Sequence, residues 1–273
     1  MMAHLTRFAV LAFVVIWGSR VSFGDKDIGE EDYYERFQKI PPAIETAKKF
    51  YKNFLGGETR RIHKRQILGN FFDVVLVIDS SSSVSSGEFV KGLSALRELV
   101  DKSRNDTNYA AITYATRAKI EFDFASSTDV AGKLRALKRS GGKTNTQAAL
   151  KLCQRMYVED QYGARPESFR RILLVTDGQS NINRNETIPS AVQLKILGIE
   201  VFVIAVGEYL EGIKELVQIA SSTDAHMYRV LNLSGLAEMI KLIPDVGQRT
   251  WIEETFGKSS EEGEEEAGPL GKL

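Results

Sequence analysis

The pattern of hydrophobic positions changes near residue 72 and then alternates between two kinds of segment up to about residue 243. Continuous apolar runs indicate strands buried on both faces, and apolar residues at every third or fourth position indicate helices. The expected strands cover 72–79, 109–115, 118–124, 170–178, 199–207 and 226–230. The expected helices cover 86–103, 128–138, 146–158, 188–197, 211–222 and 234–243. The alternation predicts an α/β fold.

The connections between these segments predict how the sheet is wound. Most strands are separated by a helix, which is typical of a doubly wound, mostly parallel sheet with helices on both faces. Only Thr116 and Arg117 separate the second and third strands, so these two should form a hairpin. The hairpin gives the predicted sheet one antiparallel edge strand.

Residues 25–70 precede this alternation and predict a helical segment followed by a basic linker. Apolar residues recur at helical spacing from Ile44 to Leu55, after Pro41-Pro42 and before Gly56-Gly57. The linker, Arg60 to Gln66, reads RRIHKRQ. We interpret it as a solvated connection, with a dibasic processing site as the alternative.

The first 24 residues have the features of a secretory signal peptide. Basic residues precede an apolar run of ten residues, FAVLAFVVIW, and small residues follow at the expected cleavage position before Asp25. The run is too short to cross a bilayer, which disfavours the alternative of an uncleaved anchor. No other stretch is long and apolar enough for a membrane span, so we expect a secreted, extracellular chain.

Charge and cysteine content narrow the classes of protein further. The chain has 36 basic and 36 acidic residues, which argues against a nucleic-acid partner. Cys153 is the only cysteine, so no disulfide forms within the chain, and its position on an apolar helix face predicts a buried thiol. Residues 249–273 are acidic and lack periodicity, which predicts a disordered tail.

Oxygen-bearing side chains gather where the predicted strands end. Asp79, Ser81 and Ser83 follow the first strand, Thr144 lies in the loop SGGKTNT, and Asp177 ends the strand ILLVTDG. The carboxyl ends of parallel strands are the usual ligand sites of such sheets. Carboxylates and hydroxyls without imidazole or thiolate suit Mg²⁺, or Mn²⁺ or Ca²⁺, rather than zinc or copper. The alternative is that the serines only cap the following helix.

The motif D-x-S-x-S, followed by a threonine and then an aspartate, resembles the metal-ion-dependent adhesion site of von Willebrand factor A domains. The resemblance covers about residues 72–244 and implies a domain over 71–248. It implies that Ser81 and Ser83 contact the ion directly and Thr144 directly or through water. It implies that Asp79 and Asp177 act through water or hydrogen bonds. It also implies that a Glu or Asp side chain of an extracellular protein takes the open coordination position.

This chain departs from the family pattern at three positions. Ser80 and Ser82 stand where glycines are frequent, and we interpret both as spacers that bind no ion. Gln147 replaces a common glycine after the loop that carries Thr144. None of the three removes an expected ligand.

Three function classes follow from this reading. A secreted, metal-dependent adhesion module is the first. A structural component of an extracellular or mineralised matrix that acts without metal is the second. A Mg²⁺-dependent phosphohydrolase is the third, but Ser81 stands where such enzymes need a second carboxylate.

A serine hydrolase is also disfavoured, because the sequence lacks the G-x-S-x-G motif. The histidines after the signal peptide are His63, in the linker, and His226, expected to be an exposed structural residue. We therefore expect no enzyme.

Three N-x-S/T sequences give candidate glycosylation sites at Asn105, Asn185 and Asn232. Asn105 lies in a polar stretch after the first helix of the alternating series. Asn185 follows the metal-site aspartate closely, so a glycan there would border the binding face. Asn232 precedes the last predicted helix, for which we expect Ser234 to be the N-cap. The oligomeric state is not predicted.

Overall fold

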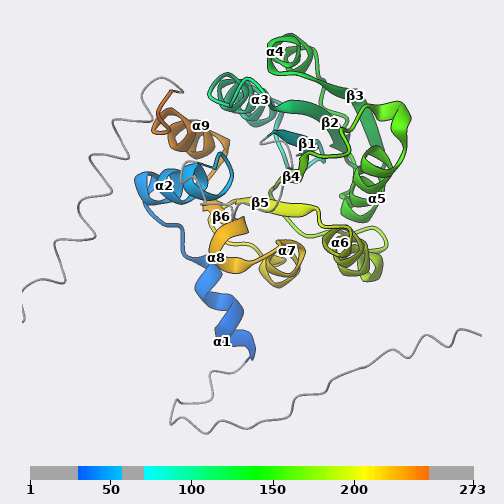
Figure 1. The fold of residues 1–273 in the computed structure, drawn as a ribbon. Coiled ribbons are helices and arrows are strands. Elements are labelled where there is room, and N and C mark those ends of the chain that lie inside the picture. The colour runs from blue at the N-terminus through cyan, green and yellow to red at the C-terminus, as the bar shows by residue number, and fades with distance from the viewer. Residues whose placement is uncertain (1–29, 57–70, 246–273) are drawn as a thin grey trace, which may run out of the picture.

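The computed structural model describes residues 30–56 and 71–245, and these contain one six-stranded sheet in the order β3-β2-β1-β4-β5-β6 (Figure 1). Its strands are β1 (Phe72–Asp79), β2 (Asn108–Tyr114), β3 (Ala118–Ser126), β4 (Phe169–Thr176), β5 (Glu200–Val206) and β6 (Met227–Val230). The predicted signal peptide 1–24, the basic linker 60–66 and the acidic tail 249–273 lie outside the described residues.

The pairing of the strands confirms the predicted fold class. β1 pairs in parallel with β2 and β4, β5 pairs in parallel with β4 and β6, and only β3 runs antiparallel, against β2. The order of the strands along the chain reverses between β1 and β4. In doubly wound sheets, the carboxyl edge at such a reversal is where ligands bind.

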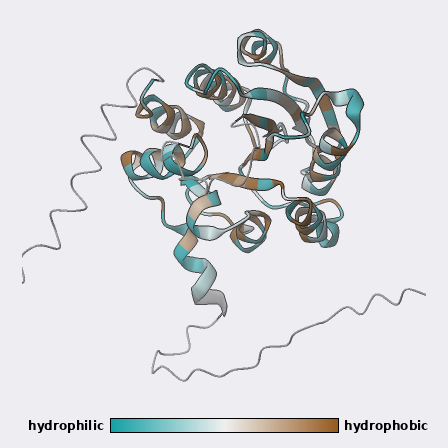
Figure 2. Ribbon diagram, viewed as in Figure 1, coloured by the Kyte–Doolittle hydropathy of each residue, from teal (hydrophilic) through white to brown (hydrophobic). Residues whose placement is uncertain are grey.

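Helices cover both faces of the sheet, as the pattern predicted (Figure 1). One face packs against α2 (Ala43–Asn53), α3 (Ser86–Asp101), α4 (Ser127–Arg135) and α9 (Leu233–Lys241). The other packs against α5 (Thr146–Val158), α6 (Thr187–Ile196) and α7 (Ile213–Ile219). Figure 2 shows the brown, hydrophobic strands between these layers.

Strand β1 shows why the sheet lies at the centre of the core. Val74, Leu76 and Ile78 belong to the apolar cluster on one face, whereas Val75 and Val77 belong to the cluster on the other. Successive side chains of a strand point to opposite faces, so a continuous apolar run fills both clusters. Each such side chain contributes about 1.5–3 kcal/mol on full burial. The strand therefore holds the residues that follow it in a fixed position.

The predicted helix 211–222 is confirmed in its middle, but its bounds are wrong, because the chain turns back to the sheet near its end. The structure has α7 (Ile213–Ile219) and a separate short helix, α8 (Thr223–His226). Between them, the N–H of Ser221 donates to the carbonyl of Val201 over 2.9 Å, and its hydroxyl accepts from the N–H of Val201 over 2.8 Å. These two bonds tie Ser221 to β5 and end α7.

Two predictions about single residues near β6 are also wrong. His226 is the last residue of α8, and its side chain is only 13% exposed, because it lies between Ser222 and Glu200. The N-cap of α9 is Asn232, whose side chain accepts from the N–H of Gly235 over 2.8 Å, whereas Ser234 lies within the helix.

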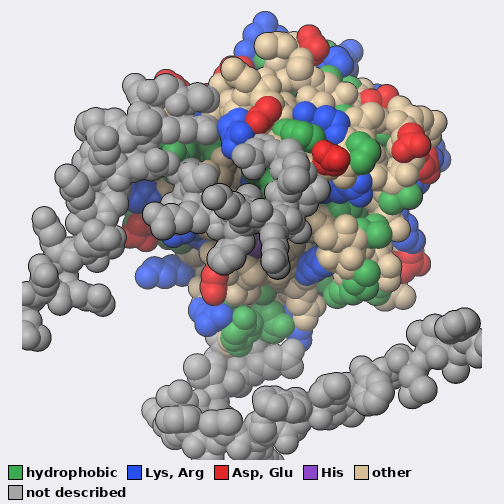
Figure 3. Space-filling view, in the orientation of Figure 1, with side chains coloured by type: hydrophobic (Ala, Val, Ile, Leu, Met, Phe, Trp, Pro, Cys, Tyr) green, Lys and Arg blue, Asp and Glu red, His purple; other side chains and the backbone are tan. Residues whose placement is uncertain are grey.

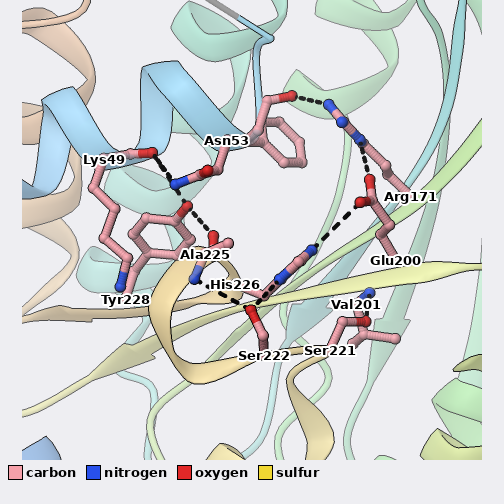
Figure 4. A network of polar contacts seen from close by, with 11 residues as sticks. Lys49, Asn53, Arg171, Glu200, Val201, Ser221, Ser222, Ala225, His226 and Tyr228 are labelled. Carbon is pink, nitrogen blue, oxygen red and sulfur yellow. Dashed lines mark hydrogen bonds and ion pairs between the residues drawn. The ribbon is translucent and has the colours of Figure 1, made fainter. Parts of the chain in front are cut away.

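The segment before the linker packs on the domain beside β6. It contains α1 (Glu30–Glu35), a 3₁₀ turn η1 (Arg36–Gln38) and α2, which confirms the predicted amphipathic helix, although Ile44 faces outward. The ammonium of Lys49 donates to the carbonyl of Met227 over 2.7 Å. The guanidinium of Arg171, labelled in Figure 4, donates to the carbonyl of Phe54. The segment is therefore anchored to the domain by polar bonds as well as apolar packing.

Cys153 lies in α5 and is fully buried, as predicted. Burial raises the pKa of its thiol, so the reactive thiolate is disfavoured. Within residues 30–56 and 71–245, no helix is long and apolar enough to cross a membrane.

Candidate metal centre

The two predicted carboxylates meet at the carboxyl edge where the strand order reverses. Asp79 is the last residue of β1, and Asp177 directly follows β4. The two strands pair in parallel, with Ile78 opposite Val175. Residues just beyond that pair therefore leave the sheet side by side. The fold thus brings together two acidic side chains that lie far apart in the sequence.

A chain of hydrogen bonds joins four of the five predicted site residues. The N–H of Ser81 donates to Oδ1 of Asp79 over 2.9 Å. The hydroxyl oxygens of Ser81 and Ser83 lie 2.9 Å apart. The hydroxyl of Ser83 donates to Oδ1 of Asp177 over 2.9 Å. The predicted ion-facing set is therefore in mutual contact at one point of the surface.

The carboxylate of Asp79 has polar partners, but among the described residues none of them is basic. Its Oδ2 accepts from the hydroxyl of Thr176 over 2.8 Å and from that of Tyr114 over 3.4 Å. Its side chain is buried, and burial raises its pKa, although the hydrogen bonds from Ser81, Thr176 and Tyr114 oppose this. The carboxylate is thus fixed in place while its negative charge stays unbalanced.

Asp177 is in a similar electrostatic position. Burial, and then the negative charge of Asp79, raise the pKa of Asp177 to about 6. In the part of the chain that the structure describes, no Lys, Arg or His forms an ion pair with either carboxylate. Two neighbouring carboxylates without a cation raise the free energy of the ionised state. A bound cation would relieve both effects.

Ser80 and Ser82 are more than spacers, which corrects the interpretation from the sequence. The N–H of Ser80 donates to the carbonyl of Tyr114 over 2.8 Å, and its carbonyl accepts from Gly141 over 2.8 Å. The hydroxyl of Ser82 accepts from the N–H of Gly142 over 2.7 Å. Gly142 has a φ of +102°, a conformation that favours glycine. The alternate serines therefore fix the loop that leads to Thr144.

Thr144 is buried beside the site, but its hydroxyl is not bonded to the other four predicted residues in the described part of the chain. Its N–H donates to Oδ1 of Asn181 over 2.9 Å, and its carbonyl accepts from the N–H of Asn181 over 2.9 Å. Asn181 follows Asp177 closely along the same loop. The loop of Thr144 is therefore fastened to the loop of Asp177.

The sequence reading missed the residues that hold these loops. Glu215 of α7 accepts from the N–H of Ser180 over 2.7 Å and from Nε of Arg184 over 3.1 Å. Burial raises the pKa of Glu215, and its bonds to Ser180 and Arg184 oppose this. A glutamate in an amphipathic helix carries no sequence signal for such a role. Asn181, in TDGQSN, offers only the weak signal of proximity to Asp177.

A cavity of about 260 Å³ adjoins the centre, and residues of the site and of α3 and α9 line it. Asp79, Ser83 and Asp177 lie at its polar side, and Phe89 and Leu233 contribute to its apolar side. Glu88 of α3 accepts from the N–H of Leu233 over 2.9 Å, which joins the starts of α3 and α9.

The three glycosylation candidates are all exposed. Asn105 lies between α3 and β2, and Asn185 lies in the 3₁₀ turn η3 (Arg184–Glu186). Asn232 lines the cavity beside the centre and uses its side-chain oxygen to cap α9. All three side chains can be reached from solvent, as a glycan requires.

The donor set fits a hard divalent cation. The described residues contain no group of three or more His, Cys, Asp or Glu side chains placed to hold a metal. What they offer is two carboxylates with raised pKa values and two adjacent serine hydroxyls, which are oxygen ligands of the kind Mg²⁺ and Ca²⁺ prefer. Mg²⁺ also keeps water molecules in its coordination shell, so it does not need an all-protein cage.

Residues 73–242 match the von Willebrand factor type A domain, so the chain belongs to this family. Relatives include matrilin-3 of Gallus gallus, 30% identical over 145 residues that make up 50% of this chain and 31% of the relative. Matrilin-1 of Bos taurus is 32% identical over 180 residues, 62% of this chain and 32% of the relative. Integrin alpha-X of Mus musculus is 26% identical over 165 residues, 57% of this chain and 14% of the relative. The matches thus span about a third or less of these relatives.

A solved structure shares the fold. Proximal thread matrix protein 1 from the mussel byssus superposes with a TM-score of 0.58 and 23% identity, over 64% of this chain and 47% of that chain. Another structure of the mussel protein has zinc in its MIDAS motif. The family and the relatives named above support an adhesion or extracellular-matrix module.

Proposed function

We propose that this chain is a secreted adhesion module that binds an extracellular protein through a divalent cation, in the first place Mg²⁺. Asp79, Ser81, Ser83, Thr144 and Asp177 would hold the ion. The observation that carries the proposal is the hydrogen-bonded chain from Asp79 to Asp177, which contains two carboxylates and no basic partner among the described residues. The matrilin and integrin relatives support the adhesive role.

Each residue has a separate task in this proposal. Ser81 and Ser83 present adjacent hydroxyl oxygens, which replace part of the hydration of the ion. Asp79 and Asp177 balance the charge of the ion. Thr144 lies on the neighbouring loop, where it would bind the ion directly or through water. When bound, the ion supplies a positive centre with exchangeable positions, which a Glu or Asp side chain of the partner can occupy. Ser80 and Ser82 keep the loops in register.

A structural role in the matrix without metal is the second candidate, because the mussel protein that shares the fold is itself called a thread matrix protein. A phosphohydrolase has less support. Ser81 stands where that chemistry needs a second carboxylate, and its N–H and hydroxyl are used within the centre. We do not propose an enzyme.

Calorimetric titration with Mg²⁺ and Mn²⁺ tests the metal site. We expect wild type to bind one equivalent, and Ser81→Ala/Ser83→Ala to bind at least tenfold more weakly. Asp123→Asn is the matched control for Asp177→Asn, because Asp123 is exposed on β3, far from the centre. Equal binding by wild type and Asp177→Asn would contradict the proposal.

Binding to an immobilised extracellular-matrix extract separates the two candidate functions. An adhesion module should bind in Mg²⁺, lose binding in EDTA, and lose it again in Asp177→Asn. A structural component acting without metal should bind equally in both buffers. An excess of free acetate should compete only in the first case, because acetate carries the carboxylate that the partner is proposed to offer.

Secretion and glycosylation remain proposals that a single expression experiment can test. Expression of the full chain in a secretory host should give a medium-borne protein that begins near Asp25. Treatment with an N-glycosidase should reduce its mass, and Asn105→Gln should remove the largest share because Asn105 is exposed between two elements. A cell-retained, full-length product would contradict the secretory assignment.

A further inference from the structure

A second charged region lies where the segment 30–56 meets the domain, away from the metal centre. A cavity of about 260 Å³ opens there between η1, α2 and the start of β6. Four basic side chains line it: Arg36, Lys39, Lys49 and Arg229. We call this region the basic cavity. Figure 3 shows lysine and arginine side chains on the surface where α2 and the segment after α1 meet.

The basic side chains of the cavity lack acidic partners. Within the described residues, no Asp or Glu forms an ion pair with Arg36, Lys39, Lys49 or Arg229. Glu45 is the one carboxylate among the lining residues. The lining therefore carries a formal excess of three positive charges, four basic side chains less one acidic.

Arg229 is the most unusual of the four. It is only 4% exposed, and its guanidinium donates to four backbone carbonyls, those of Ala205, Gln38, Gly207 and Glu208. Its Nε remains without a hydrogen-bond partner. Burial lowers the pKa of Arg229, and no opposing carboxylate acts on it. A buried cation without a counter-charge is costly and calls for an anion.

Lys49 contributes a second desolvated cation. Its ammonium donates to the carbonyls of Thr223 and Met227 and lies 4.9 Å from the centre of the Tyr228 ring, beside which it runs in Figure 4. Burial lowers the pKa of Lys49, which Asp224 only partly opposes. Two of its three N–H bonds are used, which leaves one for a ligand.

The cavity is a built feature, since polar bonds hold its walls together. The side chain of Gln38 donates to the carbonyl of Leu210 over 2.8 Å and accepts from the N–H of Leu210 over 3.0 Å. The guanidinium of Arg36 stacks 4.1 Å from the centre of the Tyr33 ring and 4.7 Å from that of Phe37. Arg36 and Lys39 are exposed at the mouth, whereas Arg229 lies buried behind them.

We propose that the basic cavity binds a sulfate or phosphate group, carried on a sugar or free in solution. A sulfate or phosphate group presents at least three acceptor oxygens to the basic side chains, whereas a carboxylate presents two. The volume approaches the lower end of known ligand pockets, which run from about 300 Å³, so it suits one headgroup or sugar ring rather than a protein segment. Phe37 and Tyr228 offer apolar surface for such a ring.

Calorimetry in EDTA tests the proposal independently of the metal centre. Full-length wild type is titrated with glucose 6-sulfate, glucose 6-phosphate, glucose, and inorganic sulfate and phosphate. We expect both sugar esters to bind and glucose not to bind. Binding of the esters at least threefold tighter than that of the inorganic anions identifies a glycan-borne group; equal binding identifies the free anion.

Variants at the mouth make the test specific, because Arg36 and Lys39 can be changed without breaking the bonds that anchor the segment. Arg36→Gln/Lys39→Gln should weaken binding about tenfold, the effect of two exposed charges at the mouth. Glu45→Gln should tighten it two- to fivefold. Arg135→Gln/Lys138→Gln, the same charge change at α4, should leave it within twofold.

Three results would overturn the proposal. Absence of binding by wild type, or equal binding by the Arg36/Lys39 variant and the α4 control, would show that the basic side chains serve the fold alone. Tighter binding of a peptide with the sequence of residues 259–267 than of the sugar esters would show that carboxylates are the preferred ligand. Unfolding midpoints of all variants, measured in the same buffer, confirm that each one is folded.

Discussion

Strand β1 carries a buried aspartate near each end. The carboxylate at the amino end pairs with a cation, and the one at the carboxyl end has only uncharged partners in the described part of the chain. Asp73, at the amino end, is fully buried and lies 2.6 Å from the guanidinium of Arg165. Asp79, at the carboxyl end, is 3% exposed and has only hydroxyls and an N–H as partners among the described residues. A buried charge with its own counter-charge serves the fold, whereas one without it is a candidate for binding.

The same difference separates the carboxylates of the next two strands. Burial alone would raise the pKa of Glu200, but the neighbouring His226, whose Nε2 lies 3.5 Å from Oε1, and the guanidinium of Arg171 outweigh this and lower that pKa to about 2 (Figure 4). At the opposite edge of the sheet, burial and Asp79 raise the pKa of Asp177 to about 6. The carboxylates of Asp73 and Glu200 at the amino edge are paired with cations, whereas those of Asp79 and Asp177 at the carboxyl edge have no such partner among the described residues.

The basic cavity has an excess of positive charge, whereas the metal centre has an excess of negative charge. Arg229 is as deeply buried as Asp79, and each lacks a partner of opposite charge in the described part of the chain. Matched pairs elsewhere, such as Arg171 with Glu200, show that this fold pairs charges where no ligand is needed. The unmatched regions therefore point to ligands of opposite sign.

The largest change in stability is expected from breaking the ion pair between Asp73 of β1 and Arg165. Arg165→Met leaves Asp73 buried without a cation, so it should lower the free energy of unfolding by about 3 kcal/mol, as for other broken buried pairs. Urea unfolding measures this. Arg135→Met, at an exposed position of α4, is the control and should cost less than about 0.5 kcal/mol. A cost below about 1 kcal/mol for Arg165→Met would contradict the comparison.

At the carboxyl edge, removing a charge should instead stabilise the metal-free protein. Without metal, Asp177→Asn should raise the free energy of unfolding by about 1 kcal/mol, because it removes repulsion with Asp79 at a half-buried site. At Mg²⁺ concentrations about 100-fold above Kd, wild type should gain about 2.7 kcal/mol and Asp177→Asn nothing. Thermal unfolding with and without Mg²⁺ measures both effects, with Asp123→Asn as the control. If Asp177→Asn is less stable than wild type in EDTA, Asp79 and Asp177 do not repel each other as the comparison of the two edges requires.

Acid should weaken the amino edge through Glu200. Its pKa in the folded protein, about 2, lies below the ordinary value of 4.5, so its stabilising contribution is present above pH 4.5. That contribution is lost as the pH falls from 4.5 towards 2. Discounted for the partial exposure of the side chain, it amounts to about 1–2 kcal/mol.

Glu200→Gln tests this assignment. The variant should be less stable than wild type at pH 6, and the difference should vanish near pH 2. Urea midpoints at a series of pH values measure it. A difference that does not change with pH would show that the ion pair with Arg171 is not its source.

The smallest effect concerns the loop that carries Thr144. Ser82→Ala removes the acceptor for the N–H of Gly142, so it should cost about 1 kcal/mol of stability. It should also weaken Mg²⁺ binding several-fold although Ser82 is not an expected ligand. Calorimetry on Ser82→Ala beside Ser86→Ala, an exposed position of α3, measures this. Unchanged metal affinity would return Ser82 to the role of a spacer.

The fold was predictable from the sequence because its signals are local. A continuous apolar run makes β1 central, and the short link around Thr116 makes β3 antiparallel to β2. The candidate metal-site residues could be proposed from the sequence because they form a spaced motif at the predicted strand ends. That prediction awaits a metal-binding measurement.

What the sequence did not reveal depends on contacts between residues far apart in the chain. The bonds of Ser82 to the loop at Gly142 and of Ser221 to β5 leave no local pattern. His226 looked like an exposed strand residue because its burial is created by Glu200 and Phe202 of the neighbouring strand. The basic cavity combines residues from both ends of the described chain, so it appears only once the chain is folded.

The most direct test of the metal centre is crystallography with Mn²⁺, because its anomalous signal locates the ion. We predict one strong peak at the carboxyl edge, within coordination distance of the hydroxyl oxygens of Ser81 and Ser83 and with both Asp79 and Asp177 beside it. The peak should be absent from crystals of Asp177→Asn grown in the same way. A wild-type crystal in millimolar Mn²⁺ without a peak at these residues would contradict the account.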